Sequence, residues 1–161
     1  MSLAERVFVG LGANLGDAAT TLRQAHAALA ALPGTAVVAF SSLYRSAPVD
    51  AQGPDFTNAV AELRTALEPE ALLDALQAIE ESHGRKRPYH HAPRTLDLDL
   101  LSYGTRELHT PRLTLPHPRA HLRAFVLQPW AELAPALSLA AFGEIAALAA
   151  KATDQAIQKL P

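Results

Sequence analysis

Two aspartates separated by a single leucine lie in the stretch 94–101, which reads Arg-Thr-Leu-Asp-Leu-Asp-Leu-Leu. Alternate side chains of an extended chain share a face, so Asp97 and Asp99 should leave the same side of a strand, with Cα atoms about 6.5 Å apart. One or two magnesium ions can bridge carboxylates at that separation. The alternative is an ordinary half-buried strand with a solvated acidic face. The sequence on either side decides between them.

Positive charge is concentrated beside this acidic pair. Segments 85–94 and 111–123 together hold seven of the 14 Lys and Arg residues and contain no acid. Solvated loops would explain such segments equally well if they stood alone. A magnesium-bound polyphosphate, however, requires cations for its oxygens and carboxylates for its metal, and the first segment leads directly into the acidic pair. The pattern therefore favours a compact anionic ligand.

The composition excludes several classes of function. The chain has 161 residues, of which 49% are apolar and 19% charged, and this size and composition predict one globular domain over 1–161. It contains no cysteine, which excludes disulfides, thiolate metal sites and a cysteine nucleophile. A net charge of −2 and 6% aromatic residues argue against a nucleic-acid partner. No signal peptide or membrane span is apparent, so we expect a cytoplasmic protein.

Hydrophobic periodicity predicts an α+β domain with at least four strands. Pro and Gly mark loops at 46–54 and 85–93, and Asp17 suits the N-terminal cap of the first helix. The expected strands are 6–12, 35–45, 55–65 and a last one that ends near 103. The expected helices are 17–32, 67–83 and a segment from about 120 through 133 that contains Pro129, followed by further Ala/Leu helix toward 161.

Other nucleotide and hydrolase motifs are missing or incorrectly spaced. The glycines of 10–16 follow G-x-G-x-x-x-G, one residue too long for a dinucleotide fingerprint, and 35–45 offers no acid for a ribose. A tight turn from strand to helix explains these glycines. The chain has neither a P-loop nor an H-E-x-x-H motif, and no Ser/His/Asp spacing. Phosphoryl-type transfer, which depends on placement and charge neutralisation, matches what is present.

The combined motifs resemble the 6-hydroxymethyl-7,8-dihydropterin pyrophosphokinase family over nearly the whole chain. This resemblance implies a ferredoxin-like α+β fold, in which a mainly antiparallel sheet carries helices on both faces in three α/β/α layers. It also implies transfer of pyrophosphate from ATP to the pterin hydroxymethyl group, a step of tetrahydrofolate biosynthesis, by a monomer. The motifs are Gly-Ala-Asn-Leu-Gly-Asp (12–17), Ser-Ser-Leu-Tyr-Arg-Ser (41–46), Pro-Asp-Phe-Thr-Asn-Ala (54–59), Gln77 to Glu80 with Gly84-Arg85, Pro93 to Leu101, and Arg112-Leu113-Thr114 with Pro116-His117.

The resemblance assigns roles to individual positions. Asp97 and Asp99 would bind two Mg²⁺ ions that bridge the triphosphate, while Arg85 and Arg94 would stabilise charge as AMP leaves. The expected nucleotide contacts are Gln77, Glu80, Arg85, Arg87, Arg94, Leu100, Arg112, Thr114, His117 and Arg123. The expected pterin contacts are Ser46, Val49, Phe56, Asn58 and Phe125, with Asn58 reading the ring edge and the two phenylalanines stacking on it. The loops 46–54 and 85–93 would close over the substrates.

The chain departs from the family pattern at several positions. His90 and His91 stand where an arginine and a tryptophan are common, and Phe56 replaces a tyrosine. None of these changes touches the carboxylate pair, so we expect activity to survive. The alternatives are a pterin- or nucleotide-binding protein without turnover and another magnesium-dependent enzyme, such as a nucleotidyl transferase.

Overall fold

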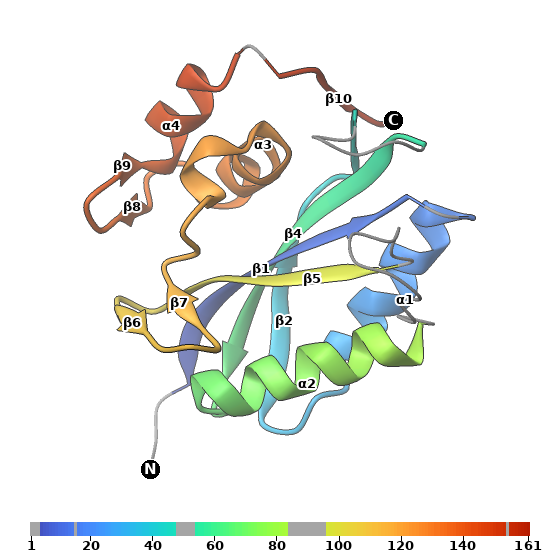
Figure 1. Ribbon diagram of the computed structural model, residues 1–161. Helices are drawn as coiled ribbons and strands as arrows, with labels where there is room; N and C mark the ends of the chain where they lie inside the picture. The colour runs from blue at the N-terminus through green and yellow to red at the C-terminus, as the bar shows by residue number, and fades with distance from the viewer. Residues whose placement is uncertain (1–3, 15, 48–53, 84–95, 154) are drawn as a thin grey trace.

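The computed structural model describes residues 4–14, 16–47, 54–83, 96–153 and 155–161. Helices separate groups of strands along the chain, and the domain is α+β, as the periodicity predicts (Figure 1). The elements are, in order, β1 (Glu5–Ala13), α1 (Ala18–Ala30), β2 (Thr35–Phe40), β3 (Tyr44–Ser46), β4 (Phe56–Thr65), α2 (Pro69–Ser82), β5 (Asp97–Tyr103), β6 (Leu108–His109), β7 (Thr114–Leu115), a 3-10 turn η1 (Ala120–Leu122), α3 (Ala124–Leu133), β8 (Ser138–Leu139), β9 (Gly143–Glu144), α4 (Ile145–Lys151) and β10 (Ile157–Lys159).

The described residues form one six-stranded sheet in which every pairing is antiparallel. The strand order is β10-β3-β4-β1-β5. Strands β3 and β2 share one edge of β4, where β3 pairs with its first half and β2 with its second half. The long strands β1 and β4 lie at the centre of the sheet, so β5 forms one of its edges (Figure 1).

Apolar side chains cover the sheet on both faces. On one face, α1 and α2 bury Leu22 and Leu76 against alternate residues of β1 and β5, including Leu98. On the other face, α3 and α4 bury Trp130 and Ile145 together with Phe8 and other strand residues. Burial of such side chains is the main contribution to folding. The expected three-layer α/β/α arrangement with a mainly antiparallel sheet is thus confirmed.

The first two helices begin as the sequence predicts. The side chain of Asp17 caps α1 by accepting a hydrogen bond from the Thr20 amide at 3.1 Å. Pro69 occupies the first turn of α2, where its missing amide hydrogen has no cost. Helix α2 ends at Ser82, next to the glycine at position 84.

The expected strand 35–45 is two strands in the structure, β2 and β3, and that expectation was wrong. The ladder is interrupted at Ser41, whose side-chain hydroxyl, and not its carbonyl, accepts a hydrogen bond from the Val60 amide at 2.9 Å. The chain then resumes pairing with β4 at Tyr44. Apolar residues flank Ser41 and Ser42 on both sides, so the sequence pattern alone does not place a break there.

The expectation of further helix toward residue 161 was also wrong. Helix α3 includes Pro129 and ends at Leu133. The next residue, Ala134, precedes Pro135, and a residue before proline disfavours the helical conformation. A hairpin of two short strands, β8 and β9, follows. Gly143 in this hairpin has a φ of 113°, a value that L-residues with side chains rarely adopt. Among the described residues beyond it, α4 is the one helix, and β10 then returns to the sheet beside β3.

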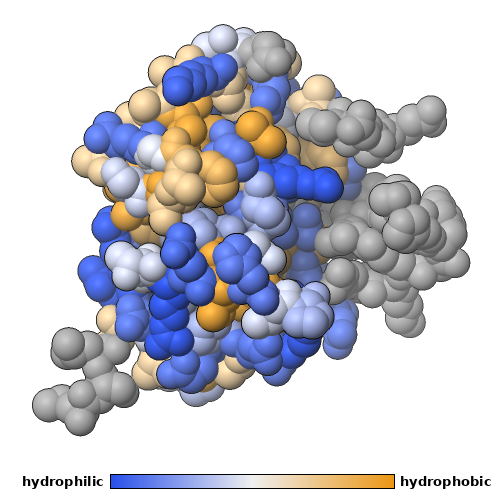
Figure 2. All heavy atoms as spheres, turned by 60° about the vertical axis from the view of Figure 1, so that its left-hand side comes forward, coloured by the Kyte–Doolittle hydropathy of each residue, from blue (hydrophilic) through white to orange (hydrophobic). Residues whose placement is uncertain are grey.

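The face formed by α3, β8–β9 and α4 carries exposed apolar side chains, whereas the rest of the same view is mainly hydrophilic (Figure 2). Leu122 and Phe142 are the large apolar residues exposed there. Among the described residues, no helix combines the length and the hydropathy that crossing a bilayer requires.

Candidate active site

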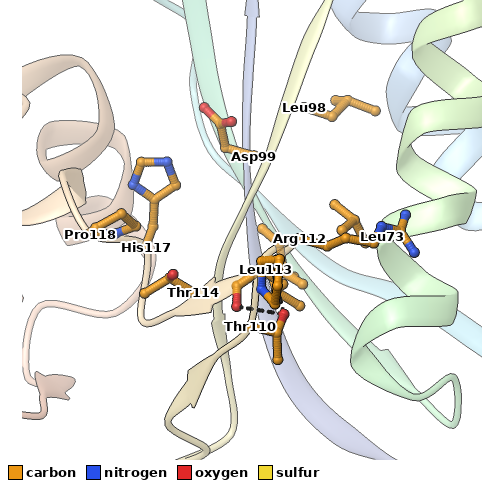
Figure 3. Close-up of a pocket in the computed structure, with 11 residues that line it drawn as sticks. Leu73, Leu98, Asp99, Thr110, Arg112, Leu113, Thr114, His117 and Pro118 are labelled. Carbon is orange, nitrogen blue, oxygen red and sulfur yellow. Dashed lines mark hydrogen bonds between the residues drawn. The ribbon is translucent and has the colours of Figure 1, made fainter.

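Asp97 and Asp99 share one face of β5, as the sequence predicts. Across the ladder they pair with Gly12 and Gly10 of β1, so no side chain of β1 stands directly opposite either carboxylate. Leu98 lies between them and points to the opposite side, into the core beneath α2 (Figure 3). The acidic pair therefore faces the layer that contains α3.

Asn58 belongs to the same row of the sheet as Asp97. It pairs with Gly12 across β1–β4, and Gly12 pairs in turn with Asp97, so one bare strand position separates the amide from the carboxylate. The Asn58 side chain is 3% exposed, and its Nδ2 donates a hydrogen bond to Ser46 Oγ at 2.7 Å. This hydrogen bond orients the amide, and its Oδ1 faces the Gly12 side.

Two phenylalanines predicted to stack on a ring lie on this face. The Phe56 ring approaches the same bare position at Gly12. Phe125, in the first turn of α3, packs against the core cluster on the α3 side of the sheet. The Arg123 guanidinium lies over this ring, with its Cζ 5.5 Å from the Phe125 ring centroid. Strands and helix thus bring Ser46, Phe56, Asn58 and Phe125 to one face of the sheet.

A pocket of about 290 Å³ adjoins Asp99 (Figure 3). Its walls come from β5, from the segment 110–118 and from α2. Four residues predicted to touch nucleotide or metal line it together: Asp99, Leu100, Thr114 and His117. Arg112 lines it too, but its guanidinium turns toward α2, where Nη2 donates to Asp74 Oδ1 at 2.5 Å and to Gln77 Oε1 at 3.4 Å. Gln77 is thereby placed beside the same pocket.

His117 lies on the side of the pocket toward which Asp99 points (Figure 3). Burial lowers its pKa to about 4, and the positive charges of Arg123 and Arg119 act in the same direction against the opposing effect of Asp97. The imidazole is therefore neutral at pH 7. Its Nδ1 accepts a hydrogen bond from the Arg119 amide at 3.1 Å, so the proton is on Nε2, which can donate to an anionic ligand.

Glu80 is a buried acidic residue near the end of α2. The resemblance predicts a nucleotide contact for it, yet the residue is 3% exposed. Its Oε2 accepts a hydrogen bond from the Leu98 amide at 2.8 Å, between the two aspartates. Glu80 follows the buried Leu76 by four residues, so helical spacing places both on the face that packs on the sheet, and this spacing was the available signal. A direct contact between Glu80 and nucleotide stays a prediction.

Several predicted positions fall outside the described residues. These are Val49, Arg85, Arg87 and Arg94, and with them the histidines at 90 and 91 and most of the two expected closing loops. Sequence reasoning also missed Gly12, which it explained by the turn into α1. Only the strand register shows that this glycine separates the predicted metal and pterin residues.

The carboxylates suit magnesium better than a metal held by protein ligands alone. Within the described ranges, no group of three or more His, Asp or Glu side chains is arranged to hold an ion. Mg²⁺ commonly uses one or two carboxylates and completes its octahedral shell with water and substrate phosphates. Two aspartates on one strand face, beside a pocket with a neutral histidine donor, are consistent with that mode of binding.

The α+β fold, with paired carboxylates beside a pocket, is consistent with an enzyme that acts on a metal-bound nucleotide. The family model for 7,8-dihydro-6-hydroxymethylpterin-pyrophosphokinase matches residues 8–135. A 2-amino-4-hydroxy-6-hydroxymethyldihydropteridine pyrophosphokinase from Pseudomonas aeruginosa is 46% identical over 160 residues, covering 99% of each chain. The corresponding protein of Bacillus subtilis is 41% identical over 127 residues, covering 78% of this chain and 76% of its own.

Solved structures agree on the fold. A Plasmodium falciparum HPPK-DHPS, wild type with pteroate, matches with a TM-score of 0.77 over 96% of this chain at 12% identity. This chain spans only 43% of that one, so the likeness concerns the fold alone. The chain belongs to the 7,8-dihydro-6-hydroxymethylpterin-pyrophosphokinase family. Its activity is pyrophosphoryl transfer from ATP to hydroxymethyldihydropterin in folate biosynthesis, in a family that uses MgATP.

Proposed function

We propose that Asp97 and Asp99 hold two magnesium ions during this transfer and that residues 1–161 act as one monomeric domain. The observation that carries the proposal is the shared face of the two carboxylates, beside a pocket on one flank and the Asn58 amide on the other. Bound magnesium would neutralise triphosphate charge and align the reacting groups. Binding and orientation of the two substrates would depend on the side chains of the protein.

The nucleotide is proposed to occupy the pocket beside β5, with its phosphates toward the aspartates. Leu100 and Thr114 contribute to its walls, and the neutral His117 donates a hydrogen bond from Nε2 to a phosphate oxygen. Arg112, whose position Asp74 and Gln77 fix, supplies positive charge at the opposite wall. The family resemblance adds Arg123, Glu80, Arg85, Arg87 and Arg94 as further nucleotide contacts.

The pterin is proposed to lie on the sheet face between the rings of Phe56 and Phe125. Flat rings stack favourably on aromatic side chains, and a fixed amide can read the hydrogen-bonding edge of a heterocycle. The hydrogen bond to Ser46 fixes the orientation of the Asn58 amide. Ser46 and Val49 complete the set that the resemblance implies.

The chemistry then requires mainly placement. The pterin hydroxymethyl oxygen forms a bond to the β-phosphorus of ATP and loses its proton, while the bond from that phosphorus to the oxygen bridging the α- and β-phosphates breaks. AMP leaves with the electron pair of that bond, and the pterin carries the pyrophosphate. Arg85 and Arg94 would stabilise the negative charge that develops on the phosphate oxygens.

Incubation of the protein with Mg²⁺, ATP and the dihydropterin alcohol tests the reaction. AMP and the pterin diphosphate should appear in equal amounts, and omission of the alcohol should stop AMP formation. Release of ADP would contradict transfer of pyrophosphate. Light scattering after size exclusion tests the monomer, and cell fractionation tests the proposed cytoplasmic location.

A further inference from the structure

Two glycines interrupt β1 on the face that carries the acidic pair. Gly10 and Gly12 pair with Asp99 and Asp97, and residues 11 and 13 between and after them are buried. The glycines with positive φ in the described chain lie elsewhere, so the backbone at these two positions does not require glycine. Glycine inside a strand weakens the strand and often marks a place where another group approaches the backbone. The two positions differ in what that group is.

The space above Gly10 is occupied by the protein itself. A Cβ at this position would lie 3.4 Å from Cδ2 of Leu101 and 3.6 Å from its Cδ1. Leu101 lies on this face because it follows Asp97 and Asp99 in the alternation of β5. The described neighbour of Gly10 is thus a core side chain, and no proposed substrate contact borders this position.

The space above Gly12 is bordered instead by the proposed pterin residues. A Cβ there would lie 3.4 Å from Asn58 Oδ1 and 3.9 Å from Phe56 Cδ1, the nearest atoms among the described residues. Both distances, like those at Gly10, are ordinary contacts, so the described residues leave room for a methyl group at either position. What distinguishes Gly12 is that its neighbours are two of the proposed pterin contacts.

We propose that Gly12 is a specificity-determining residue whose bare backbone forms the floor of the pterin slot. Asn58 and Asp97 are two strands apart, about 10 Å between Cα atoms, with Gly12 between them. A flat ring that hydrogen-bonds Asn58 must cross this position to bring its hydroxymethyl group to the metal side. A methyl group at Gly12 would occupy the volume that the ring needs.

The test replaces each glycine in turn. This inference rests on the proposed pterin pocket, so Asn58→Ala is measured beside Gly12→Ala. For Gly12→Ala the KM for the dihydropterin alcohol should rise by at least about tenfold, as steric exclusion in a fitted pocket predicts, while the KM for MgATP stays within about twofold. Gly10→Ala is the matched control and should leave the ratio of the two KM values unchanged.

Equilibrium binding supplies a second measurement that does not depend on turnover. Fluorescence titration of the alcohol, in the presence of a non-hydrolysable ATP analogue, should show the same loss for Gly12→Ala and a larger loss for Gly12→Val. Unchanged pterin affinity in both variants, or an equal loss for pterin and nucleotide, would overturn the role of Gly12. If Asn58→Ala still weakens pterin binding in that case, the proposed pocket stands. If Asn58→Ala has no effect either, the pocket assignment itself is wrong.

Discussion

The carboxylate of Glu80 in α2 accepts a hydrogen bond from the backbone amide of Leu98, the residue between the two aspartates, at 2.8 Å. Among the described strands β5 pairs with β1 alone, so its other edge has no strand to satisfy this amide. A helix side chain therefore completes the ladder at the point where the proposed metal-binding residues emerge. The position of the acidic pair depends on α2 as well as on the sheet.

Replacement of Glu80 should lower stability and disturb the acidic pair. In Glu80→Ala the Leu98 amide loses a charged acceptor in a buried place, which costs about 1–3 kcal/mol of unfolding free energy. Urea denaturation measures this loss, and the Mg²⁺ concentration needed for half-maximal AMP formation should rise in parallel. The exposed neighbour offers a control, because Glu81→Ala removes a carboxylate from the same turn without touching β5. An unchanged urea midpoint for Glu80→Ala would refute the structural role.

Removal of the Asn58 amide should separate the two substrates. Asn58→Ala is expected to raise the KM for the dihydropterin alcohol by about tenfold or more, because a buried hydrogen-bonding group of the ligand loses its partner. The KM for MgATP should change little, since the proposed nucleotide pocket lies on the other flank of the aspartates. Thr57→Ala, on the opposite face of β4, is the control. Equal losses for both substrates would be inconsistent with the pterin assignment.

Glu132 should make stability depend on pH. Burial tends to raise the pKa of this carboxyl, but hydrogen bonds from Tyr44 and Ser42 and the charge of Lys159 outweigh it and hold the pKa below its ordinary 4.5. The unfolded chain therefore binds this proton more readily, so the stabilisation is complete above pH 4.5 and is lost as the pH falls through the folded pKa.

Glu132→Gln should accordingly cost about 1 kcal/mol at pH 7, a modest value because the side chain is partly exposed. The difference in unfolding free energy between Glu132→Gln and the parent protein should narrow as the pH falls below 4.5, because the parent carboxyl then also becomes neutral. Urea midpoints across this range check the prediction, with the exposed Glu107→Gln as reference. A difference that stays constant with pH would show that packing, and not ionisation, explains the effect.

Much of the fold could be predicted because local patterns determine it. The alternation of leucine and aspartate around Asp97 and the cap at Asp17 depend on neighbouring residues alone, and the structure confirms both. The break at Ser41 depends on a hydroxyl that bonds a distant strand, which no local pattern shows. The C-terminal segment was wrong for a related reason, since alanine-rich sequence suits helix unless proline and glycine intervene at the right places.

The candidate site was predictable as far as residue types suggest chemistry. The acidic pair, His117 and Asn58 were identified from sequence and family resemblance, and the fold brings them to one face or its adjoining pocket. The roles of Glu80 and Gly12 follow from strand register and from the packing of α2 on an edge strand. Such long-range relationships appear only in three dimensions.

The most direct test of the account is AMP formation by Asp97→Asn and Asp99→Asn across a magnesium titration. Each variant keeps the shape of the side chain and removes its charge, so the urea midpoint should remain close to that of the parent. The rate at saturating ATP and pterin should fall by about three orders of magnitude or more, because charge neutralisation at the phosphates is lost. Folded variants that form AMP at the parent rate, with the same magnesium requirement, would contradict the metal-binding role of this strand.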